Sequence, residues 1–329
     1  HRIAIDTMSG DNGLGAAVPA ALMFLKEHAD TVLILVGDES QILSELEKHK
    51  QAPDERLIIQ HASQVVTMDE SPALALRGKK DSSMRVAINL VKTGDADAAV
   101  SAGNTGALMA TGRFGLRTLK GIDRPASCAA IPAAIGHTYM LDLGANIDST
   151  SDHLYQFAIM GSELVHAIDG VEKPRVGLLN IGSEDMKGNE QVKAAHEKLQ
   201  SGEFNYIGFV EGNDIFHGDV DVIVCDGFVG NVALKTSEGL ATMLSQEIKA
   251  GYTRSILTKI AALVSYPVIK RFRHRFDHRR YNGASFLGLK GIVIKSHGGA
   301  DDIAFANAIG IAREEVKEKV PDRSVDHLH

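Results

Sequence analysis

A run of small polar residues has the composition of an anion-binding loop: Ser101-Ala102-Gly103-Asn104-Thr105-Gly106-Ala107. It follows an apolar segment, residues 96–100, and so predicts a strand that turns directly into a helix. Backbone N–H groups at a helix N-terminus have no partners within the helix and readily bind anions. We therefore expect a phosphate, or a ligand that carries one, to be bound by Ser101, Gly103, Asn104, Thr105 and Gly106.

Four more segments of this kind follow predicted strands and are rich in Asp, Asn and Gly. They are residues 6–13, 142–146, 180–188 and 226–231. Taken singly, each is accounted for as a turn or a helix cap. Ligands in open α/β sheets bind beyond the carboxyl ends of the strands. We therefore expect the five segments to converge on one edge of the sheet, with Asp142, Asn146 and Asp226 binding substrate there.

Lys187 and His297 are further candidates for chemistry on a bound anion. Lys187 lies in a Gly-bounded polar loop. It is either a solvated loop lysine or a point charge that holds an anion or stabilises an oxyanion. His297 precedes a predicted helix, although a lone histidine is more often structural. Cys225 follows an apolar run, which favours a buried strand thiol over a nucleophile.

Metal and nucleotide cofactors have no matching motif. The sequence has no CxxC pair, and arginines flank His274 and His278, which disfavours a metal ion there. Neither G-x-G-x-x-G nor G-x-x-x-x-G-K-[ST] is present, because Leu289 stands where the second motif needs lysine. We therefore expect no metal and no cofactor.

Predicted strands and helices alternate along the chain and carry these residues at their ends. Short apolar runs predict strands at residues 2–6, 31–37, 56–60, 96–100, 138–143, 176–181, 205–210 and 220–225. Helical patterns lie at residues 16–27, 41–49, 84–93, 151–167, 190–200, 231–250 and 302–319. Continuous apolar runs suit strands that are covered on both faces. The order predicts a Rossmann-like, doubly wound α/β fold with a mostly parallel sheet, in a single domain over residues 1–329.

The charge balance and composition exclude several classes of protein. Lys and Arg number 35 against 42 Asp and Glu, a net charge of −7, which opposes binding to nucleic acid. No run of 18 apolar residues predicts a transmembrane helix, and the chain opens on a predicted strand rather than a signal peptide. Two cysteines among apolar neighbours suit a reducing compartment. We expect a cytoplasmic protein.

Residues 252–280 differ from the rest of the chain. They hold eight Lys or Arg against one acid, a charge of +7 in 29 residues, so the remainder carries −14. Apolar residues recur at helical spacing from Ile256 to Val264, and Pro267 ends or kinks that helix. This amphipathic excursion is either a helix pair with a solvated basic face or a docking surface for an anionic membrane or an acidic protein.

Together, these motifs resemble the phosphate acyltransferases of bacterial phospholipid synthesis, the PlsX family. The resemblance covers residues 2–320 and is carried by eight motifs in order. They are residues 6–11, 80–85, 101–107, 142–146, 180–188, 226–231, 281–284 and 295–298. Thr7 and Ser9 depart from the family's usual Asp-Ala-Met-Gly-Gly-Asp opening, replacing its Ala and first Gly with other small residues.

The resemblance implies an enzyme that transfers a long-chain acyl group from acyl carrier protein to inorganic phosphate. The acyl-phosphate then passes to a membrane-bound glycerol-3-phosphate acyltransferase. By match to the family's motifs, Lys187 and Asn231 would be the catalytic pair. The resemblance also implies a fold related to phosphotransacetylases and isopropylmalate-type dehydrogenases. It further implies a cytoplasmic homodimer with peripheral membrane association.

Three alternatives remain open. A phosphotransacetylase acting on coenzyme A thioesters would share the anion loop and the reaction type. A decarboxylating dehydrogenase would need nicotinamide and usually a divalent metal held by aspartates, but no dinucleotide motif supports it. A non-catalytic phosphate-binding or membrane scaffold protein would bind phosphate without turnover.

Overall fold

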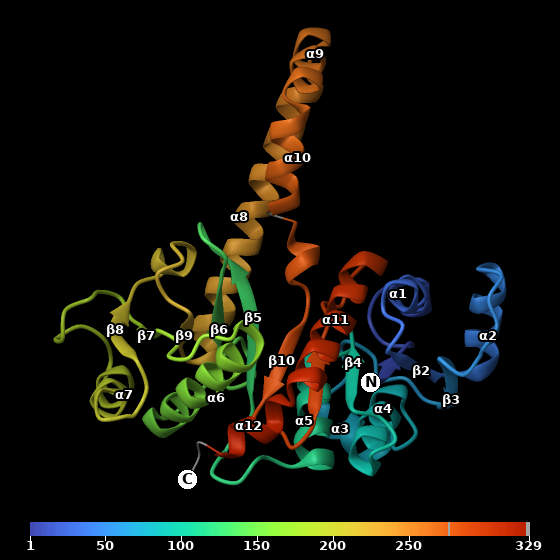
Figure 1. Cartoon of the computed structure of the whole chain (residues 1–329), viewed down its shortest axis with the longest axis horizontal. Coiled ribbons are helices and arrows are strands. Elements are labelled where there is room, and N and C mark those ends of the chain that lie inside the picture. Colours follow the sequence, from blue (N-terminus) through green and yellow to red (C-terminus); the bar gives the residue numbers. More distant parts are fainter. Residues whose placement is uncertain (276, 327–329) are drawn as a thin grey trace.

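The computed structural model describes residues 1–275 and 277–326, and a mixed sheet of eleven strands runs through its body (Figure 1). The strands are β1 (Arg2–Asp6), β2 (Val32–Gly37), β3 (Leu57–His61), β4 (Ala98–Ser101), β5 (Ala126–Pro132), β6 (His137–Leu141), β7 (Val176–Leu179), β8 (Tyr206–Val210), β9 (Val222–Val224), β10 (Ala284–Leu287) and β11 (Ile292–Lys295). Their spatial order is β3-β2-β1-β4-β11-β10-β5-β6-β9-β7-β8. Most neighbouring pairs are parallel, which confirms the predicted fold class.

The strand direction reverses at the centre of this sheet. Strands β3, β2, β1, β4 and β11 are mutually parallel, but β10 is antiparallel to both β11 and β5. Strand β5 is antiparallel to β6, and β6, β9, β7 and β8 are again mutually parallel. The second set therefore runs opposite to the first. The carboxyl ends of the two parallel sets lie at opposite edges of the sheet.

Helices connect the strands and cover the sheet. They are α1 (Leu14–Glu27), α2 (Glu39–Lys48), α3 (Pro72–Gly78), α4 (Ser83–Thr93), α5 (Thr105–Leu116), α6 (Ser151–Asp169), α7 (Glu190–Gln200), α8 (Gly227–Thr253), α9 (Ile256–Val264), α10 (Tyr266–Arg275), α11 (Asp302–Glu318) and α12 (Val320–Asp326). Two short 3-10 helices are η1 (Asp214–Phe216) and η2 (His278–Tyr281). Several begin at the predicted polar loops because a loop side chain caps them: Asn104 accepts from Ala107 N, and Asp226 accepts from Phe228 N.

The core explains why the strands read as continuous apolar runs. In β1, Ile3 and Ile5 pack with α1 and α11 on one face, whereas Ala4 packs with α4 and α5 on the other. Similar apolar layers cover both faces of β6 and β9 in the second half of the sheet. A strand buried on both faces loses the alternation of polar and apolar residues.

Strands β5, β10 and β11 are absent from the predicted strand ranges. The sequences of β5 and β10, Ala-Ser-Cys-Ala-Ala-Ile-Pro and Ala-Ser-Phe-Leu, contain few β-branched residues, so their local preference for a strand is weak, whereas β11, Ile-Val-Ile-Lys, is a short apolar run that was not predicted as a strand. Cys128 of β5 is paired with Ser285 of β10 on one side and with Leu141 of β6 on the other. The neighbouring strands, rather than local propensity, hold β5 and β10 in the sheet.

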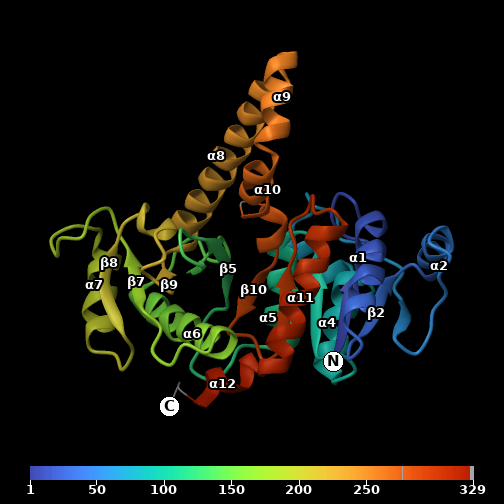
Figure 2. The same cartoon turned by 45° about the horizontal axis from the view of Figure 1, so that its top comes forward.

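A helical projection rises from the body (Figures 1 and 2). It consists of the outer part of α8 with α9 and α10, so it begins earlier than the predicted excursion at residues 252–280. Residue 276 of that range lies outside the described residues. Helix α9 ends at Val264 and Pro267 stands in the first turn of α10, as the predicted break requires. No helix of the described chain is both long enough and apolar enough to cross a membrane.

Glu315 is a buried carboxyl where α11 packs against the central strands. Its side chain is 3% exposed, and its Oε2 accepts a hydrogen bond from Ser285 Oγ at 3.0 Å. Burial raises the pKa of Glu315 to about 8, and the hydrogen bond from Ser285 opposes this rise. At neutral pH the carboxyl is therefore protonated in the folded protein but ionised in the unfolded chain.

We predict that Glu315→Gln removes a loss of stability at rising pH. Between about pH 4.5 and pH 8 the folded protein keeps a proton that the unfolded chain releases. This residue therefore lowers the free energy of unfolding by up to about 1.4 kcal/mol per pH unit. Urea unfolding from pH 5 to pH 8 should show the variant gaining stability relative to the native protein. A difference that stays constant with pH would contradict the assignment.

Candidate functional site

The carboxyl ends of β1, β4 and β11 bring three polar residues into one row. The sheet register pairs Ser101 with Asp6 on one side and with Lys295 on the other. Residues paired laterally in a parallel sheet point to the same face. Ser101 Oγ donates to Asp6 Oδ2 at 2.6 Å and accepts from Gly103 N at 3.0 Å. Asp6 is fully buried, so its carboxylate fixes the serine that shapes the predicted anion loop.

The three loops beyond this row are tied together. Asp11 N donates to Gly298 O at 2.8 Å, and Asn12 Nδ2 donates to Ala300 O at 2.9 Å. Gly10 has a φ of +89°, and a Cβ there would lie 2.9 Å from Ala102 Cβ, so only glycine fits. The opening motif, the 101–107 segment and the His297 segment therefore form one cluster, although they lie far apart in the sequence.

The N-terminus of α5 faces this cluster. Asn104 caps the helix, and its Nδ2 also donates to Met68 O and Glu70 O at 2.9 Å each, so its amide is engaged by the chain itself. Thr105 and Gly106 are exposed in the first turn. Ser9 lies beside Gly103 and is 3% exposed, and its Oγ has no hydrogen-bond partner among the described residues. A buried hydroxyl that has no partner among the described residues, next to a helix N-terminus, suits an anionic ligand.

Two lysines add positive charge beside the cluster. Burial and, to a smaller extent, the nearby charge of Lys235 lower the pKa of Lys295 to about 8, while Asp11 and Asp6 act in the opposite direction. The Lys295 ammonium donates to Ser296 O. Lys235 comes from α8 and pairs with Glu238 at 2.7 Å. Two ammonium groups held close enough to repel each other would both be stabilised by a bound anion.

His297 lies at the margin of this cluster and is exposed. The Nδ1 atom of its ring accepts from Gly299 N at 3.1 Å, and its backbone N–H donates to Asn282 Oδ1 at 2.8 Å. These bonds shape the turn before α11. Binding of substrate by His297 stays a prediction.

Asp142, Asn146 and Asp226 form a second cluster, at the ends of β6 and β9. Asp142 is fully buried, and its two oxygens accept four hydrogen bonds, from Ser127 N, Ala145 N, Asn146 N and Asn146 Nδ2, at 2.6–3.2 Å. Burial raises the pKa of Asp142 while these bonds act to lower it. Asp226 accepts from Ser149 N at 2.8 Å. These carboxylates hold the loops in shape, and contact with substrate stays a prediction.

Glycines let the start of α8 press directly on the 142–146 loop. A Cβ at Gly230 would lie 2.0 Å from Asp142 O, and one at Gly227 would lie 2.2 Å from Asn146 O. Gly144, with a φ of +97°, lies against Asn231. Asn231 itself is exposed in the first turns of α8, beside this loop.

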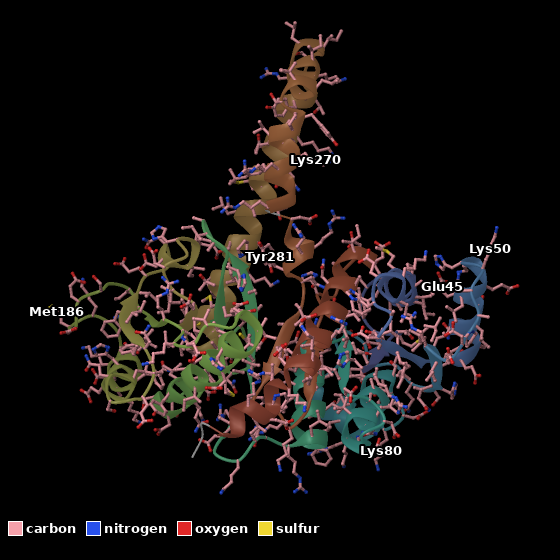
Figure 3. All side chains as sticks on the ribbon, viewed as in Figure 1. Glu45, Lys50, Lys80, Met186, Lys270 and Tyr281 are labelled. Atoms are coloured by element: carbon pink, nitrogen blue, oxygen red, sulfur yellow. The ribbon has the colours of Figure 1, made fainter. Side chains whose placement is uncertain are left out.

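Lys187 lies in the exposed loop after β7. Its backbone N–H donates to Glu184 O at 2.9 Å, and its backbone carbonyl accepts from Asn180 Nδ2 at 3.2 Å. Figure 3 places the neighbouring Met186 at the outer margin of the body, away from Tyr281 below the projection. Within the described ranges, no hydrogen bond or ion pair joins the Lys187 side chain to another predicted site residue.

The expectation that five polar segments share one edge of the sheet is wrong. The segments after β1 and β4 lie at one edge, and those after β6, β7 and β9 lie at the opposite edge. The cause is the reversal at β10, β5 and β6, two strands of which the sequence pattern did not indicate. Helix α8 starts at the second edge, and its residue Lys235 is electrostatically coupled to Lys295 at the first. It therefore links the two clusters.

Lys295, Lys235 and the Ser9 hydroxyl are candidate site residues that sequence reasoning missed. Lys295 stood within a recognised motif, yet a lysine at the end of a strand carries no signal of burial. Lys235 reads as one of many helix-surface cations. Cys128 and Cys225 are buried free thiols whose pKa values are raised by burial, which confirms the interpretation of both as core residues. The described residues contain no group of three or more His, Cys, Asp or Glu that could hold a metal ion.

The fold and these loops define an α/β protein of the Rossmann-like class with polar clusters at its strand ends. A family model described as "Fatty acid synthesis protein" matches residues 1–323. A phosphate acyltransferase from Methylococcus capsulatus is 60% identical over 98% of this chain and 95% of its own length. One from Legionella pneumophila is 55% identical over 99% and 96%. The chain therefore belongs to the phosphate acyltransferase family, the PlsX family.

Solved structures support the same fold at low sequence identity. A phosphotransacetylase from Streptococcus pyogenes superposes with a TM-score of 0.67 at 16% identity, covering 96% of this chain and 94% of its own. A 4-hydroxythreonine-4-phosphate dehydrogenase from Klebsiella pneumoniae gives 0.54 at 14% identity, covering 96% and 99%. The likeness extends to the fold of both phosphotransacetylases and dehydrogenases.

We predict that Gly230→Ala disrupts the second cluster, because its Cβ would meet the Asp142 carbonyl. The free energy of unfolding should fall by about 2–4 kcal/mol, measured by urea denaturation. Gly239→Ala is a matched control in the same helix, where a Cβ meets nothing within 4 Å. This control should gain about 0.5–1 kcal/mol. Equal effects of the two changes would contradict the close packing of α8.

Proposed function

We propose that the protein transfers a long-chain acyl group from acyl carrier protein to inorganic phosphate and releases acyl-phosphate. Membership of the phosphate acyltransferase family supports acyl transfer to phosphate in lipid synthesis. The observation that carries the proposal is the anion-binding cluster, where the N-terminus of α5 faces the orphaned Ser9 hydroxyl beside Lys295. Acyl carrier protein as the donor is our inference from the motif resemblance.

Inorganic phosphate is already an anion at neutral pH, so the reaction needs no nucleophilic side chain. A phosphate oxygen attacks the thioester carbonyl carbon, and a carbon–oxygen bond forms. The carbon–sulfur bond then breaks, and the leaving thiolate takes up a proton to give the free carrier thiol. The protein must therefore orient the two reactants and stabilise the oxyanion between these steps.

The proposed roles follow the two clusters. Residues 101–106 seat phosphate on the α5 N-terminus, and Lys295 offsets its charge. Asn231 stands four residues before Lys235 on α8, about 6 Å along the helix, and donates a hydrogen bond to the reacting carbonyl. Lys187 stabilises the oxyanion once its exposed loop approaches α8. Asp142, Asn146 and Asp226 hold the loop on which Asn231 rests.

We propose peripheral membrane association through the projection. Ile256, Leu257, Leu263 and Val264 are each between 78% and 79% exposed there, next to basic side chains, which suits an anionic membrane surface. Acyl-phosphate made in the cytoplasm would then be released near a membrane-bound glycerol-3-phosphate acyltransferase. Leu240, Met243 and Leu244 are also exposed along α8, and we propose that a second copy of the chain covers them in a homodimer.

The function is tested by release of free thiol from palmitoyl-acyl carrier protein, with palmitoyl-coenzyme A and acetyl-coenzyme A in parallel. Release that requires phosphate and favours the carrier-protein substrate would support the proposal. Preference for acetyl-coenzyme A would instead select a phosphotransacetylase. Phosphate binding without release from any thioester would leave a scaffold protein, and reduction of a nicotinamide would select a dehydrogenase.

We predict that Lys187→Ala and Asn231→Ala each lower kcat by about 10²–10³, the usual loss when one oxyanion donor is removed. Both side chains are exposed, so unfolding midpoints should stay near that of the native protein. Near-native turnover by both folded variants would refute their assignment.

We predict that Lys295→Met raises the KM for phosphate at pH 7 by about 10- to 100-fold, the worth of one charge-assisted hydrogen bond. In the native protein this KM should rise above about pH 8, as the ammonium loses its proton. Lys295→Arg keeps its positive charge above pH 8, so its KM for phosphate should increase less with pH than that of the native protein. Lys50→Met, an exposed control far from the cluster, should match the native profile. A KM unchanged by Lys295→Met would remove Lys295 from the site.

A further inference from the structure

A groove of about 930 Å³ lies on a part of the body that the proposed reaction does not use. It is bounded by the last turns of α4 and α5, by α3 and by the turn between β10 and β11. Four exposed cations line it: Lys92, Arg113, Arg117 and Lys290. No acidic residue of the described chain lines it, although the chain as a whole carries −7.

The groove combines these cations with an apolar floor. Leu76, Val91 and Leu116 line it, together with Phe114, an aromatic residue that is 67% exposed. The Arg85 guanidinium stands 6.0 Å above the Phe114 ring. An exposed aromatic ring between basic side chains is typical of a surface that binds a partner.

Among the described residues, the basic side chains that line the groove have no acidic partner. Lys92, Arg117 and Lys290 form no ion pair with a described residue, and Arg113 reaches only the Asp123 carbonyl, at 3.4 Å. Acidic neighbours would neutralise the charge of surface cations. The four cations of the groove have no acidic neighbour among its lining residues, so their combined electrostatic field favours an acidic partner.

Arg117 adds an observation of a different kind. Its backbone has φ +65° and ψ 170°, a region in which glycine is favoured and other residues are strained. Its N–H donates to Arg113 O and its carbonyl accepts from Lys290 N, each at 3.1 Å, so the strained residue joins the two sides of the groove. Arginine stands where glycine would relieve strain, which points to a use for its guanidinium.

We propose that this groove docks an acidic amphipathic helix of the carrier protein that delivers the acyl group. An apolar stripe would fill the floor, and carboxylates would meet the four cations. A concave floor suits a helix, whereas a flat bilayer does not enter it. The identity of the partner as the acyl donor rests on the proposed function.

The groove is placed to serve the anion cluster. Helix α5 has its N-terminus in the cluster and its C-terminus in the groove, and its 12 residues span about 18 Å. A flexible arm from a partner seated in the groove would follow this helix towards the bound phosphate. Figure 3 shows Lys80, just after α3, on the side of the body away from Lys270 on the projection. Helix α3, which bounds the groove, ends two residues before Lys80. A partner bound in the groove would therefore leave the projection free.

The test is direct binding of palmitoyl-acyl carrier protein to the full chain, measured by calorimetry without phosphate. The double reversal Lys92→Glu with Arg113→Glu should weaken binding by about tenfold or more and reduce its dependence on salt. The matched control is Lys259→Glu with Lys270→Glu, the same charge change at exposed positions on the projection. It should leave the Kd within about twofold of the native value.

Other outcomes would overturn the proposal. These are no binding by the native chain, native affinity in the groove variant, or a loss confined to the projection variant. Loss of binding to phosphatidylglycerol vesicles in the groove variant would assign the groove to a membrane instead. Binding is read without turnover, so an enzyme inactive on every thioester that still binds through the groove refutes the proposed function alone. If the native enzyme turns over palmitoyl-acyl carrier protein and the groove variant binds it as tightly as the native chain, only the docking site is refuted.

Arg117→Gly separates the role of the side chain from the fold. Removing the strain should raise the unfolding midpoint, while removing the guanidinium should weaken carrier-protein binding. A variant that is more stable and binds as tightly as the native chain would show that Arg117 has no part in docking.

Discussion

The reversal of strand direction at the centre of the sheet decides where the polar loops lie. Strands β10, β5 and β6 join two parallel sets that run in opposite directions, so their polar carboxyl ends lie at opposite edges. A site that uses both sets needs an element that crosses between them. Helix α8 is that element, since it begins against the 142–146 loop and the charge of its Lys235 acts on Lys295.

Each half of the sheet uses a fully buried aspartate at the end of a strand to organise its loops. Asp6 holds Ser101 at one edge, and Asp142 accepts four hydrogen bonds at the other. Burying a carboxylate is costly unless hydrogen bonds compensate it. Both loops are thereby shaped before any ligand arrives, which lowers the reorganisation that phosphate or thioester binding requires.

Surface charge divides the molecule between separate tasks. Basic residues concentrate on the projection and around the groove beside α5, while the chain as a whole is acidic. The two surfaces differ in shape, because the apolar residues of the projection protrude and those of the groove lie in a recess. A protruding apolar tip suits a membrane and a recess suits a protein helix. In our proposals, the reactants therefore arrive and leave on different sides.

Local patterns in the sequence were enough to predict the alternation of strands and helices, the polar loops at which helices begin, and the buried thiols. They did not indicate β5 or β10, whose alanine-rich and serine-rich residues become strands only between neighbours. Without those strands the reversal was hidden, and five polar segments were assigned to one edge. The pairing of distant strands determines which segments meet, and the packing of α8 brings the charge of Lys235 to bear on Lys295. Those relations follow from strand pairing and burial, which involve residues distant in the chain.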